Sequence, residues 1–326
     1  MPMNSHLPVR LKAETKFKKV LIMQQFKNGD RVVFLGDSII GCSRIATLTA
    51  ECYHRLFPDR KVYFFNCGAA GGDTVFGLKI LEEDVFACNP THVVLAYGTN
   101  DSWRWCLNDR RHKERYDLLK EKYHLFKENL QKLCKIITDK GINLILCTPL
   151  PYDEYTTKET DALKGGYALL AEYANTVREV AKDQNIPFCD IYEGIVEIMQ
   201  NQDENIFSSD RIHPTEHGGY LMTKIFLNSQ GIDIGEEKPL PEYIQKWHTA
   251  VCDFRKLYTA ENMLKLGADK PVAERIKKAK EILENPNTSE WYLSLAKNYL
   301  KNKETQTETL KHITKLYEQT VLEQEI

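Results

Sequence analysis

Short apolar stretches recur along residues 31–191, and a helix-compatible segment separates each from the next. The stretches are Arg31–Leu35, Lys61–Phe65, His92–Tyr97, Ile142–Cys147 and Pro187–Ile191. Strand-favouring runs that alternate with helical segments at this spacing are typical of right-handed β–α–β units. The pattern therefore predicts an α/β fold with a doubly wound, parallel sheet of about five strands.

The first three stretches each end in a turn that contains glycine. The turns read GDS at residues 36–38, GAAGGDT at residues 68–74 and GTND at residues 98–101. Successive parallel strands end at one edge of the sheet, where ligands bind in open α/β folds. A glycine there lets backbone N–H groups approach a ligand closely. Ser38 could act at this edge as a nucleophile or as a helix cap, and this stretch alone leaves both open.

A second group of polar residues lies late in the sheet region, in SSDRIHPTEHGGY at residues 208–220. The Asp210-x-x-His213 spacing lets the carboxylate fold back onto the imidazole, as a general base requires of its partner. Two other interpretations compete. Asp210 could cap a helix that begins at His213, or Asp210, His213 and His217 could bind a metal ion.

These four stretches together resemble the SGNH hydrolases, also called GDSL esterases and lipases. FLGDSI, NCGAAGGDT, YGTND and DRIHP occur in the family's order, and the resemblance extends over roughly residues 28–232. It implies a flavodoxin-like three-layer α/β/α fold with a mostly parallel five-stranded sheet. The chain lacks the Gly-x-Ser-x-Gly elbow of ordinary α/β-hydrolases. No cofactor and no metal ion are expected.

The resemblance also implies roles for particular residues. Ser38 would be the nucleophile, His213 the general acid and base, and Asp210 the carboxylate that orients His213. A serine hydroxyl is a poor nucleophile until a base takes its proton, so this division of roles is chemically reasonable.

The oxyanion hole would consist of the Ser38 backbone N–H, the Gly71 backbone N–H and the Asn100 side-chain amide. Such donors each contribute about 3 kcal/mol to acyl transfer. The double glycine leaves a choice at the second position. Counting from the start of its block favours Gly71, whereas the following Asp-Thr pair could favour Gly72.

An inserted Trp103-Arg104-Trp105 stretch follows the Asn100 block almost directly. Two indoles and a guanidinium beside an active site could stack on a sugar ring or hold a carboxylate, so we expect a substrate-binding role. The same residues could equally anchor the loop.

The composition changes after Ile234, and we expect three regions: an N-terminal lead-in at 1–27, the hydrolase domain at 28–234 and a helical C-terminal extension at 235–326. Apolar residues in the extension recur at helical spacing and predict three or four amphipathic helices. These helices could pack on the sheet or on each other. They could also form a wall of the active site or a surface for a homo-oligomer.

The bulk composition excludes several classes of protein. A net charge of -2 gives no support for binding nucleic acid or an anionic membrane. No stretch reaches the ~20 apolar residues of a membrane span, and the N-terminus lacks a signal-peptide core. The nine cysteines show no C-x-x-C pair or zinc spacing, so we expect reduced thiols and a cytoplasmic location.

The sequence therefore predicts a serine esterase that removes a small acyl group, most simply acetyl, from a carbohydrate or similar hydroxylated molecule. The small-molecule ester would be its main partner. A lysophospholipase or thioesterase of the same family is the first alternative. A metal-dependent hydrolase and a non-catalytic binding module are the others.

Overall fold

The computed structural model describes residues 23–108, 112–156, 161–200 and 206–323. Its centre is one sheet of β1 (Arg31–Gly36), β2 (Tyr63–Gly68), β3 (His92–Ala96), β4 (Asn143–Cys147) and β5 (Phe188–Cys189). All neighbouring strands pair in parallel, in the order β2-β1-β3-β4-β5. This order is flavodoxin-like and confirms the predicted fold class. The fifth strand is shorter than the sequence suggested.

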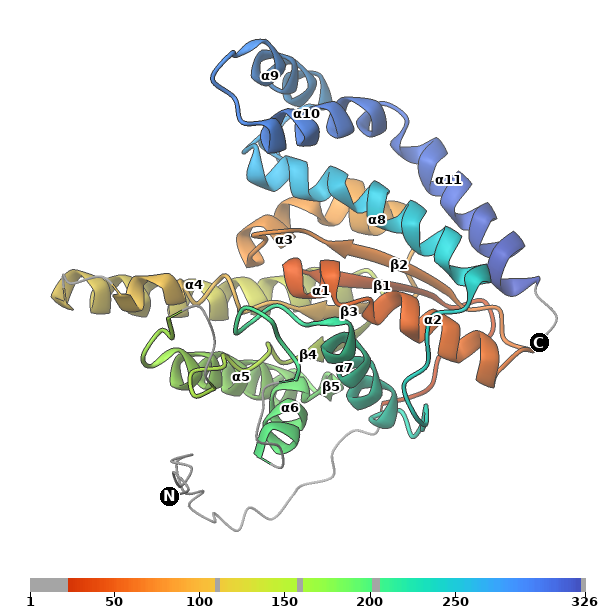
Figure 1. The fold of residues 1–326 in the computed structure, drawn as a ribbon, viewed down its shortest axis with the longest axis horizontal. Helices are drawn as coiled ribbons and strands as arrows, with labels where there is room; N and C mark the ends of the chain where they lie inside the picture. The colour runs from red at the N-terminus through yellow and green to blue at the C-terminus, as the bar shows by residue number, and fades with distance from the viewer. Residues whose placement is uncertain (1–22, 109–111, 157–160, 201–205, 324–326) are drawn as a thin grey trace.

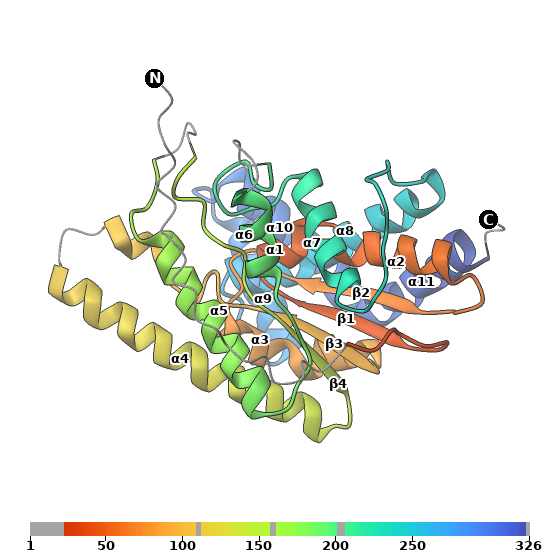
Figure 2. The same ribbon diagram turned by 90° about the horizontal axis from the view of Figure 1, so that it is seen from below.

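Helices cover both faces of the sheet (Figures 1 and 2). On one side lie α1 (Ser38–Cys42), α2 (Ile45–Leu56), α6 (Ile191–Gln200) and α7 (Glu216–Asn228), and on the other lie α3 (Thr74–Ile80), α4 (His112–Asp139) and α5 (Gly166–Asp183). Alternate residues of each strand therefore enter two apolar layers. Phe34 of β1, for example, meets Phe226 of α7 with ring centroids 5.6 Å apart.

The helix-compatible segment between the second and third predicted strands is divided in the structure. The helix-compatible segment 75–86 forms α3, then the π-helical turn η1 (Leu81–Val85), then the short 3₁₀ turn η2 (Phe86–Cys88). A widened π turn changes which side chains face the protein. Here it directs Asp84 into the interior, where its side chain is almost fully buried.

The helical C-terminal extension is present as α8 (Glu242–Met263), α9 (Val272–Glu284), α10 (Glu290–Lys303) and α11 (Gln306–Tyr317), followed by the π turn η4 (Glu318–Leu322). Helix α8 lies beside β2, an edge strand of the sheet (Figure 1). The Tyr317 hydroxyl donates to the Val62 carbonyl, 3.0 Å away. The extension thus packs on the sheet and on itself.

Part of the predicted lead-in, residues 1–22, lies outside the described residues. Within the part of the chain that the structure describes, no helix is both long enough and apolar enough to cross a membrane.

Candidate active site

The turn after β1 places Ser38 at the carboxyl edge of the sheet. Gly36 has no side chain, and a Cβ there would lie 2.5 Å from the Ala96 carbonyl oxygen of β3. The buried Asp37 caps α1 by accepting the Ile39 N–H at 2.8 Å. Ser38 is therefore not the cap, because its neighbour fills that position, and its hydroxyl is available for another partner.

That partner is His213, 175 positions later in the chain. The Ser38 Oγ lies 2.9 Å from His213 Nε2, and His213 Nδ1 lies 2.6 Å from Asp210 Oδ2. Asp210 does not cap the following helix, since Thr215 caps α7 by accepting the Gly218 N–H at 3.0 Å. The structure thus brings the three residues together and removes the capping interpretation of both Ser38 and Asp210.

The carboxylate of Asp210 sets the proton positions in this chain of contacts. Partial burial acts to raise its pKa, but hydrogen bonds from the His213 ring and the His213 backbone N–H together hold the pKa below its ordinary value. An ionised carboxylate only accepts, so Nδ1 donates to Asp210. In a neutral imidazole this leaves Nε2 free to accept the Ser38 proton.

His217, which the sequence offered as a third metal ligand, has a different partner. Its Nδ1 contacts the Glu237 carboxylate in the segment after α7. Among the described residues, no three His, Cys, Asp or Glu side chains form a group that could hold a metal ion.

The two candidate N–H donors in the glycine-rich turn after β2, those of Gly71 and Gly72, differ in their hydrogen bonding. Gly72 donates its N–H to the Ala69 carbonyl at 3.1 Å. Gly71 is exposed, has φ +67°, and its N–H has no acceptor among the described residues. The Gly71 N–H is therefore the free donor of the pair.

Asn100 reaches the same turn from the loop after β3. Its Nδ2 donates to the Gly72 carbonyl at 2.9 Å. An amide nitrogen carries two hydrogens, so this bond fixes the side chain and leaves the second hydrogen for another acceptor. The structure thus links the second and third of the four sequence blocks directly.

Asp101, which the sequence interpretation did not single out, also joins these two loops. It accepts the Thr74 N–H at 2.9 Å and the Gly98 N–H at 3.1 Å. Burial raises its pKa to about 6 although the bonds from Thr74 oppose this. The sequence could have indicated Asp101 through its position directly after Asn100, in the loop that follows a predicted strand.

The Trp103–Trp105 stretch continues from the loop after β3 that carries Asn100. Trp103 has φ +46°, which is rare for a bulky residue and is held here by its surroundings. Its ring lies 5.3 Å from that of Trp105, which is about half exposed. Arg104 instead points inward and donates to the Thr99 carbonyl at 3.0 Å. That contact favours loop anchoring by Arg104, whereas Trp105 presents an aromatic face to solvent.

Comparisons with known proteins identify the family of the chain. The model of the GDSL-like lipase/acylhydrolase family matches residues 34–219. An acetylxylan esterase from Geobacillus stearothermophilus is 26% identical over 229 residues, which are 63% of this chain and 96% of that protein.

Two solved structures share the fold. A gut microbial diltiazem-metabolizing enzyme is similar with a TM-score of 0.73 at 18% identity, over 92% of this chain and 97% of that one. A variant of an acetyl xylan esterase from Geobacillus stearothermophilus gives a TM-score of 0.54 at 23% identity, over 65% of this chain and 99% of its own. The chain therefore belongs to the GDSL-like lipase/acylhydrolase family and is a carboxylic ester hydrolase.

Proposed function

We propose that Ser38 is the nucleophile of this esterase and that it forms an acyl-enzyme with the acyl group of the substrate. The observation that carries the proposal is the continuous contact from Ser38 Oγ through His213 to Asp210, with distances of 2.9 and 2.6 Å. Both lie within hydrogen-bonding range, which is the geometric requirement for a serine activated by a histidine base.

The reaction takes place in two steps. Ser38 Oγ attacks the ester carbonyl carbon while His213 Nε2 takes its proton. His213 then returns that proton to the departing alcohol as the C–O bond breaks. In the second step a water molecule gives a proton to His213 and attacks the acyl carbon. His213 then returns that proton to Ser38 Oγ as the bond between Oγ and the acyl carbon breaks, which releases the carboxylic acid. The oxyanion of each tetrahedral intermediate is bound by the N–H groups of Ser38 and Gly71 and by the Asn100 amide.

Labelling with a fluorophosphonate tests the nucleophile. We expect one phosphonyl adduct per chain, located on Ser38 by peptide mass spectrometry, and none in Ser38→Ala. Hydrolysis of p-nitrophenyl acetate should fall at least about 10⁴-fold in that variant. Ser209→Ala, which removes an exposed serine in the loop before His213, should label and react normally. Activity in Ser38→Ala that is lost on adding a chelator would instead support a metal-dependent hydrolase.

We further propose acetyl as the acyl group and a carbohydrate as the alcohol. Support comes from the acetylxylan esterase relative and from the half-exposed Trp105, because indole faces stack on sugar rings. A panel of p-nitrophenyl acetate, butyrate and octanoate, together with acetylated xylooligosaccharides, tests this. Preference for the octanoate or for acyl thioesters would support the lipase or thioesterase alternative.

Trp105→Ala separates the alcohol site from the chemistry. We expect KM for acetylated oligosaccharides to rise several-fold, since a stacked ring contributes about 1 kcal/mol. Turnover of p-nitrophenyl acetate, which lacks a sugar, should stay unchanged. Tyr116→Ala removes a more exposed aromatic from α4 and is the control.

The proposed cytoplasmic location is supported by the free state of the nine cysteines, most of which are buried. Cell fractionation tests it. The predicted homo-oligomer through the C-terminal helices stays a prediction, which light scattering at several protein concentrations can test.

A further inference from the structure

The last turns of α8 lie against the glycine-rich turn that carries Gly71. Thr259 Oγ1 accepts the Ala70 N–H at 3.1 Å, and Asn262 Nδ2 donates to the Ala70 carbonyl at 2.9 Å. Residues three apart share one face of a helix, so both side chains reach the same turn. Both polar backbone groups of Ala70 are thus bound by the C-terminal extension, about 190 positions away in the sequence.

The bond to the Ala70 carbonyl determines where the next N–H points. The Ala70 carbonyl and the Gly71 N–H belong to one planar, trans peptide unit, in which the two groups point in opposite directions. Asn262 holds the carbonyl toward α8. The Gly71 N–H must therefore point away from α8.

The turn itself does not fix this orientation. Gly72 N–H bonds to the Ala69 carbonyl, and Gly71 at φ +67° occupies the third position, as in a type II turn. A type I turn has the same outer hydrogen bond but the opposite orientation of its central peptide. Glycine accommodates both forms, so an external contact is needed to select one.

Helix α8 also limits the space on its side of the turn. A Cβ built on Gly71 would lie 3.0 Å from Met263 Sδ and 3.3 Å from Asn262 Nδ2. The turn is therefore in close contact with α8 along the peptide that carries the free N–H.

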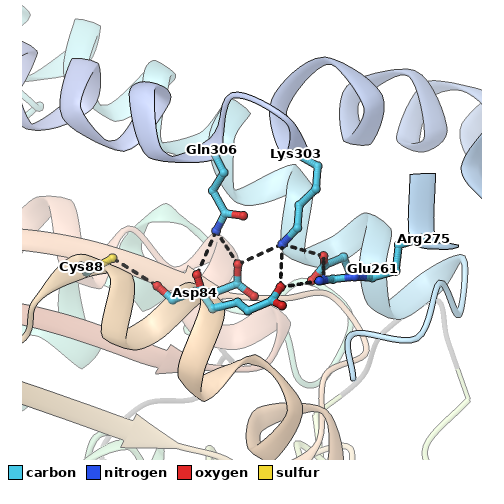
Figure 3. A network of polar contacts seen from close by, with 7 residues as sticks. Asp84, Cys88, Glu261, Arg275, Lys303 and Gln306 are labelled. Carbon is cyan, nitrogen blue, oxygen red and sulfur yellow. Dashed lines mark hydrogen bonds and ion pairs between the residues drawn. The ribbon is translucent and has the colours of Figure 1, made fainter. Parts of the chain in front are cut away.

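A buried ion network fixes α8 in this place (Figure 3). Glu261, between the two residues that bind Ala70, contacts Arg275 Nη1 at 2.7 Å and Lys303 Nζ at 3.0 Å. Lys303 also contacts Asp84 at 3.4 Å. Asp84 lies on η1, which continues from α3, and α3 begins directly after the glycine-rich turn. The helix and the segment that follows the turn are thereby joined at a second point.

We propose that Asn262 and Thr259 are positioning residues for catalysis, through which α8 holds the Ala70–Gly71 peptide with its N–H directed at the oxyanion. This inference rests on the proposed function, specifically on the oxyanion-hole role of Gly71. The C-terminal extension then completes the active site, although it contributes none of the reacting groups.

Asn262→Asp is the sharpest test, because it keeps the shape and replaces the donor by an acceptor that repels the Ala70 carbonyl. We expect kcat for p-nitrophenyl acetate to fall about 10- to 100-fold, the scale of a misplaced or lost oxyanion donor. KM should stay within about twofold, since the ground-state ester does not need this donor. Binding of phenylboronic acid, which forms a tetrahedral anionic adduct with the serine, should weaken by a factor similar to the loss in kcat/KM.

Thr259→Val should lower kcat less, because it frees only the preceding peptide. Thr259→Ser, which restores the hydroxyl, should recover most of the activity. Asn302→Asp and Thr249→Val are matched controls, since among the described residues each of these side chains bonds only to a carbonyl of its own helix. Both controls should keep the kcat and the boronate affinity of the parent protein.

Wild-type kcat and boronate affinity in Asn262→Asp, with Ser38→Ala inactive, would overturn this inference and leave the proposed function intact. Loss of activity that merely follows a lower Tm, with no change in the affinity of the folded protein for boronate, would overturn it as well. Full activity in Ser38→Ala would overturn the proposed function itself.

Discussion

Two clusters of charged residues, His213 with Asp210 and Arg275 with Glu261, Lys303 and Asp84, differ in their exposure to solvent. In the first, the His213 and Asp210 side chains keep 40% and 47% of their surface exposed. In the second, Arg275 and Glu261 are completely buried, and Lys303 and Asp84 almost so. A hydrolase must exchange protons and water at its base, which requires access. A cluster that solvent cannot reach cannot exchange water or protons during turnover. It can, however, hold two segments of the chain in a fixed arrangement.

The two clusters also shift the pKa of aspartate in opposite directions. Asp210 is held below its ordinary pKa because hydrogen bonds from His213 outweigh its partial burial. Burial, helped by the nearby Glu261 carboxylate, raises the pKa of Asp84 to about 7 despite the Lys303 ammonium. Exposure therefore decides which effect prevails. The comparison predicts that the first cluster controls rate and the second controls stability.

The largest expected effect is on rate. His213→Ala removes the proposed base, and kcat should fall on the order of 10⁴-fold or more. Because the side chain is partly exposed, Tm should change by only a degree or two, on the order of 0.5 kcal/mol. Steady-state kinetics and calorimetry measure both, with the exposed His312→Ala as control. A large fall in Tm for His213→Ala would contradict the expectation that the first cluster affects rate and not stability.

The next effect is on stability. Lys303→Met leaves the Asp84 and Glu261 carboxylates buried without their ammonium partner, which should cost about 3–5 kcal/mol of unfolding free energy. For a chain of this size that corresponds to a fall in Tm on the order of 10 °C. Urea unfolding gives the value, and Lys301→Met, exposed on the same helix, is the control. A loss no larger than that of Lys301→Met would contradict the view that this network joins the extension to the sheet.

A smaller effect concerns pH. Asp84 has a pKa of about 7 when folded and an ordinary value of 3.8, so the folded state keeps a proton that the unfolded state releases between these values. Its contribution to stability is therefore complete at low pH and is lost as pH rises toward 7. Asp84→Asn cannot titrate, and its Tm should fall less than that of the wild type between pH 4 and 7.

The Tm of Asp84→Asn should still depend on pH, because Asp37 and Asp101 are buried and have raised pKa values of about 7 and about 6. We expect the stabilities of the wild type and Asp84→Asn to diverge by up to about 3 kcal/mol across this range, since one unit of pKa difference corresponds to about 1.4 kcal/mol. Parallel curves would show that Asp84 stays ionised beside Lys303.

The smallest expected effect on stability comes from an ion pair that is exposed on the protein surface. Lys135 and Asp139 lie 2.8 Å apart, one turn apart on α4, and both are exposed. Lys135→Ala should change stability by less than about 0.5 kcal/mol, and added salt should reduce even that. Equal losses in Lys135→Ala and Lys303→Met, measured by urea unfolding, would remove burial as the distinction between the clusters.

Much of the fold and of the candidate site follows from local sequence. Runs such as Arg31–Leu35 favour strands wherever they occur, and a glycine turn after each of the first three runs places those turns at one edge of a parallel sheet. The Asp210-x-x-His213 contact needs only one turn of loop. These features depend on neighbours in the chain, so the sequence by itself determined them.

Other features needed the tertiary structure. Asp37 rather than Ser38 caps α1, and Gly71 rather than Gly72 keeps a free N–H, because single hydrogen bonds decide between adjacent residues. The contact of Asn262 with Ala70 joins positions 192 apart, and the partners of Lys303 come from two separate elements, η1 and α8. No periodicity encodes such pairings. They depend on how α8 lies against the edge strand β2, which only the packed chain determines.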